Sequence, residues 1–218
     1  MPLQLYEKEK IIDACFEVFV LHGYAKTSTV MLAEAAGISK ALIFHHFESK
    51  KKLYICILER CFDKMTSELN QESPAEYGDF FEAKEQIGLK TIDYMRKNPK
   101  LNRILFEAFY STPDELKSEI HQFKAYMDEK YGAMNVEREN QMMKLFNKIS
   151  LREGVDPKEA YEFIQVVSEY FRMKLATELT DSKKIYDDGY WDNFFEKKNS
   201  FLDMVRFGIE AHTCFLEE

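Results

Sequence analysis

The chain has 218 residues, of which 45% are hydrophobic and 31% are charged. This ordinary globular balance excludes a mainly disordered chain, and the formal net charge of −8 argues by itself against a nucleic acid as partner. No apolar run approaches the ~18 residues of a membrane span. The first residues, MPLQLYEKEK, are too charged for a signal peptide, so we expect a cytoplasmic protein without a membrane partner.

The charge is unevenly distributed along the chain. Residues 1–52 carry seven lysines against six acidic residues, whereas the rest carries 23 basic and 32 acidic residues. This asymmetry indicates two regions with different tasks. With only 8 glycines and 5 prolines, long helices joined by short connections are favoured. The cysteines lack metal-ligand spacing, which indicates small apolar residues of the core and a reducing compartment. They are Cys15, Cys56, Cys61 and Cys214.

Four helices are expected in the N-terminal region. Apolar residues recur with helical spacing over residues 6–22, and Gly23 stands where a glycine cap belongs. A hydroxyl residue, Ser28 or Thr29, can cap a short second helix, and Ser39 can cap a third. The expected spans are 6–22, 30–36, 40–46 and 50–72.

The segment SPAEYGD at residues 73–79 is the clearest break in the chain. It separates two predicted domains, residues 5–65 and 75–218. Beyond it, several prolines stand at or near helix starts, where a missing N–H costs nothing. No strand pattern persists anywhere, so the predicted fold class is all-α. The helices expected after the break are 80–97, 100–110, 113–130, 136–153, 157–179 and 191–216.

The stretch AEAAGISKALIFHHFESKKKLY (33–54) predicts a helix-turn-helix motif over about residues 28–47. Ala33 is small enough to let a second helix approach, and Gly37 supplies the φ > 0 position of a short turn. An apolar seam between the helices can form from Leu32, Ala36, Ile38, Ile43 and Phe47. Lys40 and its apolar neighbours then face outward, which suits base edges and thymine methyls in a major groove better than water.

From Tyr6 to about Leu69 the chain resembles the N-terminal DNA-binding domain of TetR-family transcriptional regulators. The family pattern, a glycine–aromatic turn, a Thr/Ser-rich cap and IAxxAGVSxGxLYxHFxSKxxL, is met by GYAKTSTVMLAEAAGISKALIFHHFESKKKL. Ala41 replaces the usual glycine. Phe44 replaces the usual tyrosine, whose phosphate contact is therefore not carried over. The resemblance implies a three-helix DNA-binding domain joined by a long fourth helix to a C-terminal helical ligand-binding and dimerisation bundle.

The resemblance also implies individual DNA contacts. Thr29 corresponds to a phosphate or base contact, and Lys50, at the N-terminus of the fourth helix, corresponds to a phosphate contact. The base-reading turn corresponds to Lys40, Ala41 and Leu42, and the groove-wall contacts correspond to Phe44, His45 and His46. Alternatives stay open, since His46 can be a core histidine and the lysine run 50–52 a solvated face. A metal site at the two histidines is not expected, because consecutive helix positions point about 100° apart.

The C-terminal two thirds show no catalytic motif, neither a phosphate loop nor GxSxG nor HExxH, so we expect neither an enzyme nor a cofactor. Clusters of aromatic residues and methionines instead predict an apolar pocket for a small-molecule effector. An aromatic row at helical spacing can equally be core. The candidate ligand-binding residues are Tyr94, Phe106, Phe109, Tyr110, Tyr126, Met127, Phe146, Tyr170, Met173 and Trp191.

The resemblance further implies that the last two long helices pair with those of a second subunit. A symmetric dimer fits DNA readout, because one small recognition helix contacts too few bases to be selective alone. The helices that fit are 157–179 and 200–216. The predicted interface residues are Ile164, Val167, Phe171, Leu175, Phe201, Val205, Gly208, Ile209 and His212.

These patterns together predict a homodimeric DNA-binding regulator, a repressor released from a palindromic double-stranded operator by a small apolar or amphipathic effector. Because the effector domain is acidic, we expect a lipophilic or cationic compound, although a buried basic residue such as Arg103 or Arg172 could still pair with an anion. An activator, or a regulator without ligand, stays open. The alternative from another class is an all-α ligand-binding or enzymatic bundle without DNA function, which steep salt dependence of duplex binding would exclude.

Overall fold

The computed structural model describes residues 2–179 and 183–211. Within these ranges the chain is helical, and the only β-type pairing is an isolated bridge between Leu151 and Glu210. The all-α prediction is confirmed. None of the described helices is both long and apolar enough to cross a membrane.

The chain folds into two compact units. The first comprises Met1–Glu68 and Asn98–Lys130, and the second comprises Leu69–Lys97 and Tyr131–Glu218. Residues 98–130, which follow the predicted domain break at 73–79, thus pack with the N-terminal helices. The functional division into residues 5–65 and 75–218 stays a prediction.

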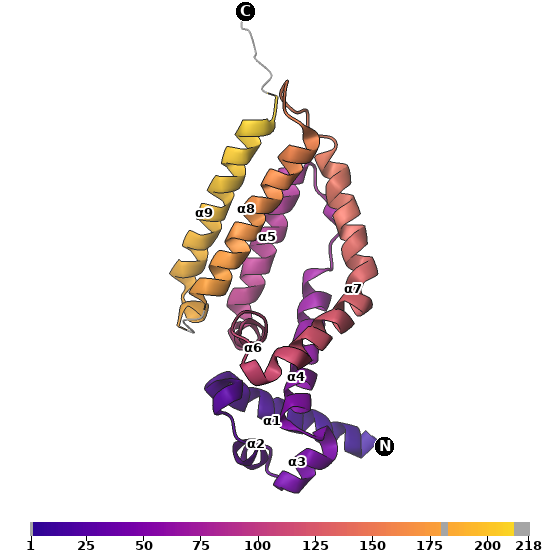
Figure 1. Cartoon of the computed structure of the whole chain (residues 1–218), viewed down its shortest axis with the longest axis vertical. Helices are drawn as coiled ribbons and strands as arrows, with labels where there is room; N and C mark the ends of the chain where they lie inside the picture. The colour runs from indigo at the N-terminus through magenta and orange to yellow at the C-terminus, as the bar shows by residue number, and fades with distance from the viewer. Residues whose placement is uncertain (1, 180–182, 212–218) are drawn as a thin grey trace, which may run out of the picture. The chain divides into compact units, whose positions relative to one another are not determined.

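The first unit contains α1 (Pro2–Lys26), α2 (Thr29–Ala36), α3 (Lys40–Phe47), α4 (Lys50–Leu69) and α6 (Pro99–Tyr110), together with the start of α7 (Figure 1). Gly23 adopts φ 73° and ψ 168°, so the regular part of α1 ends where the glycine cap was expected. Ser28 caps α2, Gly37 ends it in a left-handed conformation, and Ser39 caps α3.

An aromatic cluster lies in the core of the first unit. Phe19, Tyr24 and Tyr54 are fully buried, and the Tyr54 ring meets each of the other two edge-on at a centroid distance of 5.1 Å. The Tyr54 hydroxyl donates to the Glu107 carboxylate on α6 at 3.0 Å. Burial, followed by the charge of Glu107, raises the pKa of Tyr54, so this hydroxyl keeps its proton. The cluster therefore ties α1, α4 and α6 together.

The helix α7 (Lys117–Phe146) differs from the sequence prediction. Two helices were expected, over 113–130 and 136–153, and a single helix of 30 residues is observed. Gly132, which lies between the two expected helices, is helical, because a helix-interior glycine costs only about 1 kcal/mol relative to alanine. The short turn η2 (Asp114–Leu116) precedes the helix.

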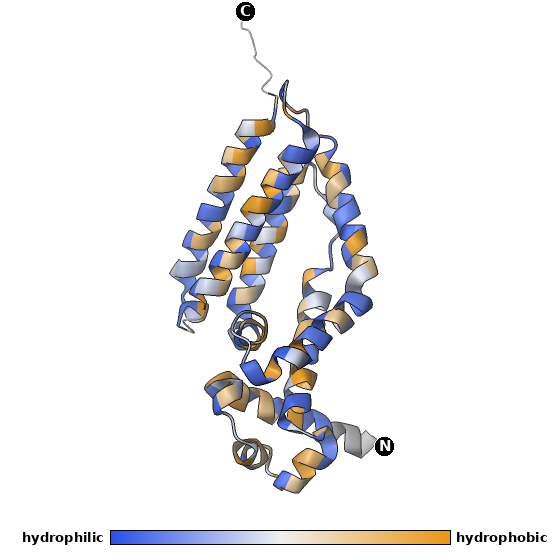
Figure 2. Cartoon of the chain, in the orientation of Figure 1, coloured by the Kyte–Doolittle hydropathy of each residue, from blue (hydrophilic) through white to orange (hydrophobic). Residues whose placement is uncertain are grey.

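The second unit is built on α5 (Phe80–Lys97), α8 (Pro157–Glu178), α9 (Asp188–Ile209) and the end of α7, with the short turns η1 (Pro74–Glu76) and η3 (Lys184–Tyr186). The helices α5, α8 and α9 run side by side (Figure 1). Apolar and polar residues alternate around each of them (Figure 2), as expected for helices that bury one face.

The bounds of α5 match the prediction, whereas the last helix begins earlier than residue 191. The Asp187 side chain accepts the N–H of Tyr190 and caps α9, which therefore begins at Asp188. The helix was expected to reach residue 216 and ends at Ile209. Its Trp191 is completely buried and donates its indole N–H to the carbonyl of Ile185 at 3.1 Å.

Candidate functional site

The helix-turn-helix is formed by α2, α3 and the turn between them. The N–H groups of Gly37 and Ile38 donate to the carbonyls of Glu34 and Ala33 at 3.1 and 3.0 Å, which closes the C-terminus of α2. The Ser39 hydroxyl then accepts the N–H of Leu42 at 3.2 Å and starts α3. These local bonds fix the direction of α3 and hence the side chains that it exposes.

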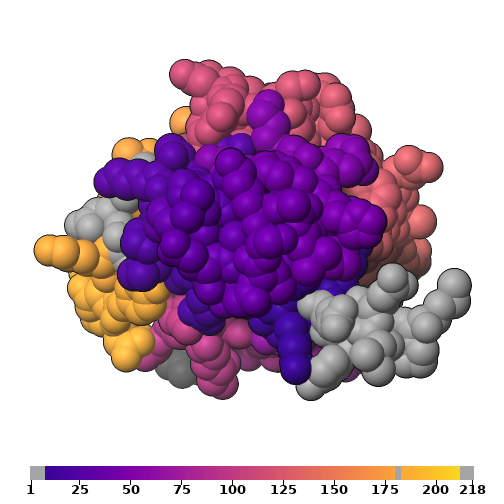
Figure 3. Space-filling model, turned by 90° about the horizontal axis from the view of Figure 1, so that it is seen from below, coloured from indigo at the N-terminus to yellow at the C-terminus, as the bar shows by residue number. Residues whose placement is uncertain are grey.

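The exposed face of α3 carries five of the predicted contact residues. Figure 3 looks directly onto the surface of the N-terminal segment that contains it, in indigo and purple. The opposite face is buried through Ile43 and Phe47, which form the predicted seam with Leu32. The exposed residues are Lys40, Ala41, Leu42, Phe44 and His45.

Two other predicted contacts are partly covered. His46 is half-buried, and its ring lies 5.5 Å from that of His45 and 6.1 Å from that of Phe47, measured between centroids. Thr29 is half-buried at the first position of α2, whose cap is Ser28. Both side chains therefore keep only part of their surface accessible.

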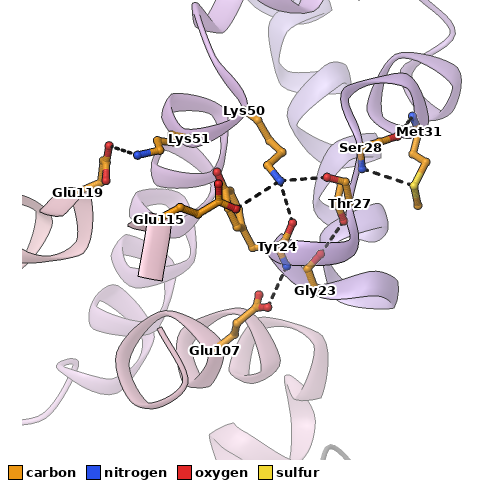
Figure 4. A network of polar contacts seen from close by, with 10 residues as sticks. All are labelled: Gly23, Tyr24, Thr27, Ser28, Met31, Lys50, Lys51, Glu107, Glu115 and Glu119. Atoms are coloured by element: carbon orange, nitrogen blue, oxygen red, sulfur yellow. Dashed lines mark hydrogen bonds and ion pairs between the residues drawn. The ribbon is translucent and has the colours of Figure 1, made fainter. Parts of the chain in front are cut away.

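Lys50 is held within the protein (Figure 4). Its amine donates to the backbone carbonyls of Tyr24 and Thr27 at 3.1 Å each, and lies 3.9 Å from the Tyr24 ring centroid. Glu115 forms an ion pair with the same amine at 3.9 Å, and only 19% of the side chain is exposed. The observed contacts of Lys50 therefore stabilise the connection between α1 and α2.

A cavity of about 430 Å³ lies in the second unit. Its walls come from α5, α7, α8 and α9, with Pro74 from the short turn η1. The lining carries three basic groups, Lys84, Arg138 and Lys198, against one carboxylate, Glu139. The cavity is thus locally basic inside an acidic domain.

Burial affects the two lysines directly. It lowers the pKa of Lys198 to about 8, helped by the positive charge of Lys84, and it also lowers the pKa of Lys84. The Lys84 amine lies 3.4 Å from the Ser168 hydroxyl, which itself donates to the carbonyl of Ile164 at 3.0 Å. Each amine is therefore less strongly protonated than an exposed lysine.

Residues 11–56 match the family model for bacterial regulatory proteins of the tetR family. The match runs from α1 through the helix-turn-helix into α4, the same segment whose exposed face was described above. This N-terminal segment is therefore a TetR-family DNA-binding segment.

Characterised relatives match only part of the chain. The transcriptional regulator RutR of Escherichia coli is 30% identical over 128 residues, which are 57% of this chain and 58% of RutR. The transcriptional activator FasR of Mycolicibacterium smegmatis is 26% identical over 111 residues, 51% of this chain and 50% of FasR. The chain thus spans about half the length of the relatives that it matches. They are transcriptional regulators, as expected for a chain without catalytic motifs.

Solved TetR-family structures share the fold over nearly the whole chain. A regulator from Mesorhizobium loti aligns with a TM-score of 0.61 and 18% identity, covering 95% of this chain and 98% of its own. The Pseudomonas aeruginosa repressor MexZ aligns with a TM-score of 0.59 and 17% identity, covering 97% of this chain and 98% of MexZ. At such low identity these similarities establish the fold alone.

The predicted ligand-binding residues do not line the cavity. Those in the first unit are Phe106, Phe109, Tyr110, Tyr126 and Met127, and those in the second are Tyr94, Phe146, Tyr170, Met173 and Trp191. Some are buried core, such as Trp191, whereas Met173 is exposed. Aromatic residues cluster because their rings pack on each other. Clustering in the sequence therefore does not distinguish residues that line a pocket from core or surface residues.

The predicted dimer-interface residues lie mostly inside the second unit. Five of them are buried in the single chain, namely Ile164, Val167, Phe171, Val205 and Ile209. Their role in a dimer interface stays a prediction. Leu175, Phe201 and Gly208 are half-buried, and His212 lies outside the described residues. The exposed apolar residues of the same two helices are Phe163, Val166, Tyr170, Met173, Met204 and Phe207.

Sequence reasoning missed the two cavity lysines, although a signal was present. Lys84 stands in the apolar row of Phe80, Gly88 and Ile92, and Lys198 stands between Phe194 and Leu202 with the same spacing. A lysine inside the buried row of an amphipathic helix indicates either a long side chain that reaches solvent or a functional amine.

Proposed function

We propose that this TetR-family chain is a homodimeric transcriptional repressor that binds a palindromic operator and releases it when a small effector binds the second unit. The observation that carries the proposal is the exposed face of α3 within a segment that matches the family model. Lys40 supplies hydrogen-bond donors for a base edge, and Leu42 supplies apolar contact for thymine methyls.

The proposal is tested by binding of the full chain to the DNA upstream of its own gene, over a series of salt concentrations. A regulator loses affinity steeply as salt rises, because bound counterions are released from the DNA phosphates. Binding of equal strength to operator and random duplexes would contradict a regulator. Absence of any salt-dependent binding would favour the alternative, a helical bundle without DNA function. Repression is checked with a reporter gene placed behind the same DNA. Deleting the regulator gene should raise reporter expression if the protein is a repressor and lower it if the protein is an activator.

The Lys40→Ala variant should weaken operator binding by about 1–3 kcal/mol and relax the preference at one base step in each half-site. Lys40 lies exposed at the first turn of α3, from which we expect it to reach base edges. Fluorescence anisotropy on operator and mutated duplexes measures both effects. The matched control is Lys158→Ala, which changes another exposed lysine, at the start of α8, and should alter neither quantity. Equal loss on operator and random DNA would assign Lys40 to a phosphate instead.

The Lys50→Met variant separates a structural role from a phosphate contact. Since the amine donates to two backbone carbonyls, its loss should lower the free energy of unfolding by about 1.5–3 kcal/mol. If the Lys50 amine also binds a DNA phosphate in the wild type, the slope of log affinity against log salt should be smaller by about one in the variant. We expect the melting temperature to fall while the slope stays unchanged for folded protein.

The dimer is proposed to form through exposed faces of α8 and α9 rather than through the residues first predicted. The row of Phe163, Val166, Tyr170 and Met173 follows one face of α8, and Met204 and Phe207 are exposed on the adjacent α9. Soluble monomers rarely expose a contiguous patch of this kind. A second copy of the chain would cover it and place two recognition helices for symmetric half-sites.

A further inference from the structure

The cavity in the second unit combines an apolar wall with a basic end. Side chains of four helices supply the apolar part, which would hold a hydrocarbon or aromatic group; they include Ile87, Ile92, Met95, Met142, Leu175 and Phe194. The volume of about 430 Å³ falls within the range of small-molecule sites. The apolar wall alone would suit the lipophilic effector expected from the sequence.

The basic end is formed by the amines of Lys84 on α5 and Lys198 on α9. A Cβ atom added at Gly88 would lie 2.9 Å from the Lys198 amine, so the missing side chain of Gly88 leaves the space that this amine occupies. Among the residues that the structure describes, no carboxylate forms an ion pair with either lysine. Two neighbouring, half-buried cations without such a partner are unfavourable unless an anion joins them.

The remaining charged groups of the lining do not supply that anion. Glu139 on α7 accepts the hydroxyl of Tyr161, and its charge acts on Lys84 without forming an ion pair. Arg138, also on α7, donates to the backbone carbonyl of Glu72 at 3.0 Å. From α8 the lining contains only Ser168 and Leu175, neither of which titrates. The lining therefore has more positive than negative groups.

We propose that this cavity binds an organic anion with an apolar body, whose carboxylate-type head group is held by Lys84 and Lys198 while the body lies against the apolar wall. Hydrogen bonds in which both partners are charged are stronger than neutral ones, and an anion between the two amines would also remove their mutual repulsion. The assignment reverses the expectation of a lipophilic or cationic effector. It rests on the proposed function only in naming this anion as the effector that releases DNA.

The site should bind its anion more weakly as pH rises. Lys198 has a pKa of about 8 in the empty site, so its amine is already charged below that pH, whereas above it the amine must take up a proton when the anion binds. The groups that face Lys198 are Lys84 on α5 and Arg138 and Glu139 on α7. Of these, Lys84 has a pKa lowered from the usual lysine value and works in the same direction.

The test is calorimetric titration of the full chain with three ligands of equal length, octanoate, octanamide and octylamine, and with benzoate as a rigid anion. We expect binding by octanoate or benzoate, with an affinity that falls between pH 7 and pH 9, and none by octylamine. Lys198→Met should weaken the anion about ten- to hundredfold, and Lys198→Arg should restore part of the affinity. Lys197→Met, an exposed lysine on the same helix, is the control and should bind like the wild type.

Two results would overturn the site. One is binding of octylamine or octanamide as tight as that of octanoate, and the other is failure of both anions to bind a folded wild-type chain. Unchanged anion affinity in Lys84→Met and Lys198→Met would overturn the assignment of the head group. The role as effector is measured separately, by adding the anion to the operator complex. Operator binding that octanoate leaves unchanged, with calorimetric binding intact, would contradict the effector role and leave the site standing.

Discussion

Replacing Phe171 with glutamate should unfold the second unit, whereas Phe207→Glu should leave a folded chain that no longer dimerises. Phe171 on α8 is 2% exposed, and its ring meets those of Phe194 and Phe201 edge-on at 5.5 and 5.3 Å. Losing a buried phenylalanine costs about 3–5 kcal/mol, and a buried carboxylate without a partner adds to it. This approaches the total stability of an ordinary domain, about 5–15 kcal/mol.

Phe207 is 63% exposed on α9 in the single chain, so a glutamate there remains hydrated and should leave the melting temperature of the monomer nearly unchanged. In a dimer that covers this residue, the same carboxylate would lose its water. Circular dichroism melting and sedimentation equilibrium of both variants separate the two effects. Asp203→Asn, also exposed on α9, is a surface control. A folded, monomeric Phe171→Glu variant together with a dimeric Phe207→Glu variant would contradict the proposed faces.

Local signals in the sequence predicted the helix-turn-helix well. Ser28, Gly37 and Ser39 act on the N–H and C=O groups of their own turn, so their effect does not depend on distant neighbours. The bounds of α5 were predicted for a similar reason, because the break before Phe80 and Pro99 behind it bracket the helix. Where the signal and its physical cause lie within a few residues of each other, sequence reasoning is sufficient.

The buried faces of α8 and α9 could not be predicted in the same way. On α8 one apolar row contains Ile164, Val167 and Phe171, and another contains Phe163 and Val166. Helical periodicity fits both rows. The choice between them depends on which helices pack against α8 in the folded unit, and this information is not local.

The basic lining of the cavity was missed because the prediction used the net charge of the whole C-terminal region and not the charges around the cavity. The C-terminal region is acidic as a whole, yet α5 and α9 direct Lys84 and Lys198 to one cavity. Net charge governs long-range attraction, whereas a bound ligand is selected by the groups within hydrogen-bonding distance. The sequence placed each lysine in an apolar row, and only the packing of the helices brought the two rows together.

Gly23→Ala should be strongly destabilising in the first unit. Gly23 has φ 73° and ψ 168°, a region open essentially to glycine alone, and forcing another residue into it costs about 1–3 kcal/mol. A Cβ atom there would also lie 2.7 Å from Oε1 of Glu107. That carboxylate accepts the N–H of Tyr24 at 2.8 Å and the hydroxyl of Tyr54 at 3.0 Å, so it cannot retreat without losing one of these hydrogen bonds.

The matched control is Gly132→Ala in α7, where a Cβ atom would meet nothing within 4 Å and the backbone is helical. This variant should be neutral or more stable by up to about 1 kcal/mol, because alanine favours the helix. Denaturant unfolding of both variants measures the difference. The Tyr24 carbonyl also accepts a hydrogen bond from the Lys50 amine. We therefore expect Gly23→Ala to shift the connection that orients α2 and to lower operator affinity even when the protein is folded. If Gly23→Ala were as stable as the wild type, Glu107 and the connection between α1 and α2 would have to shift at little energetic cost. The contacts around Lys50 would then not fix the position of the recognition helix.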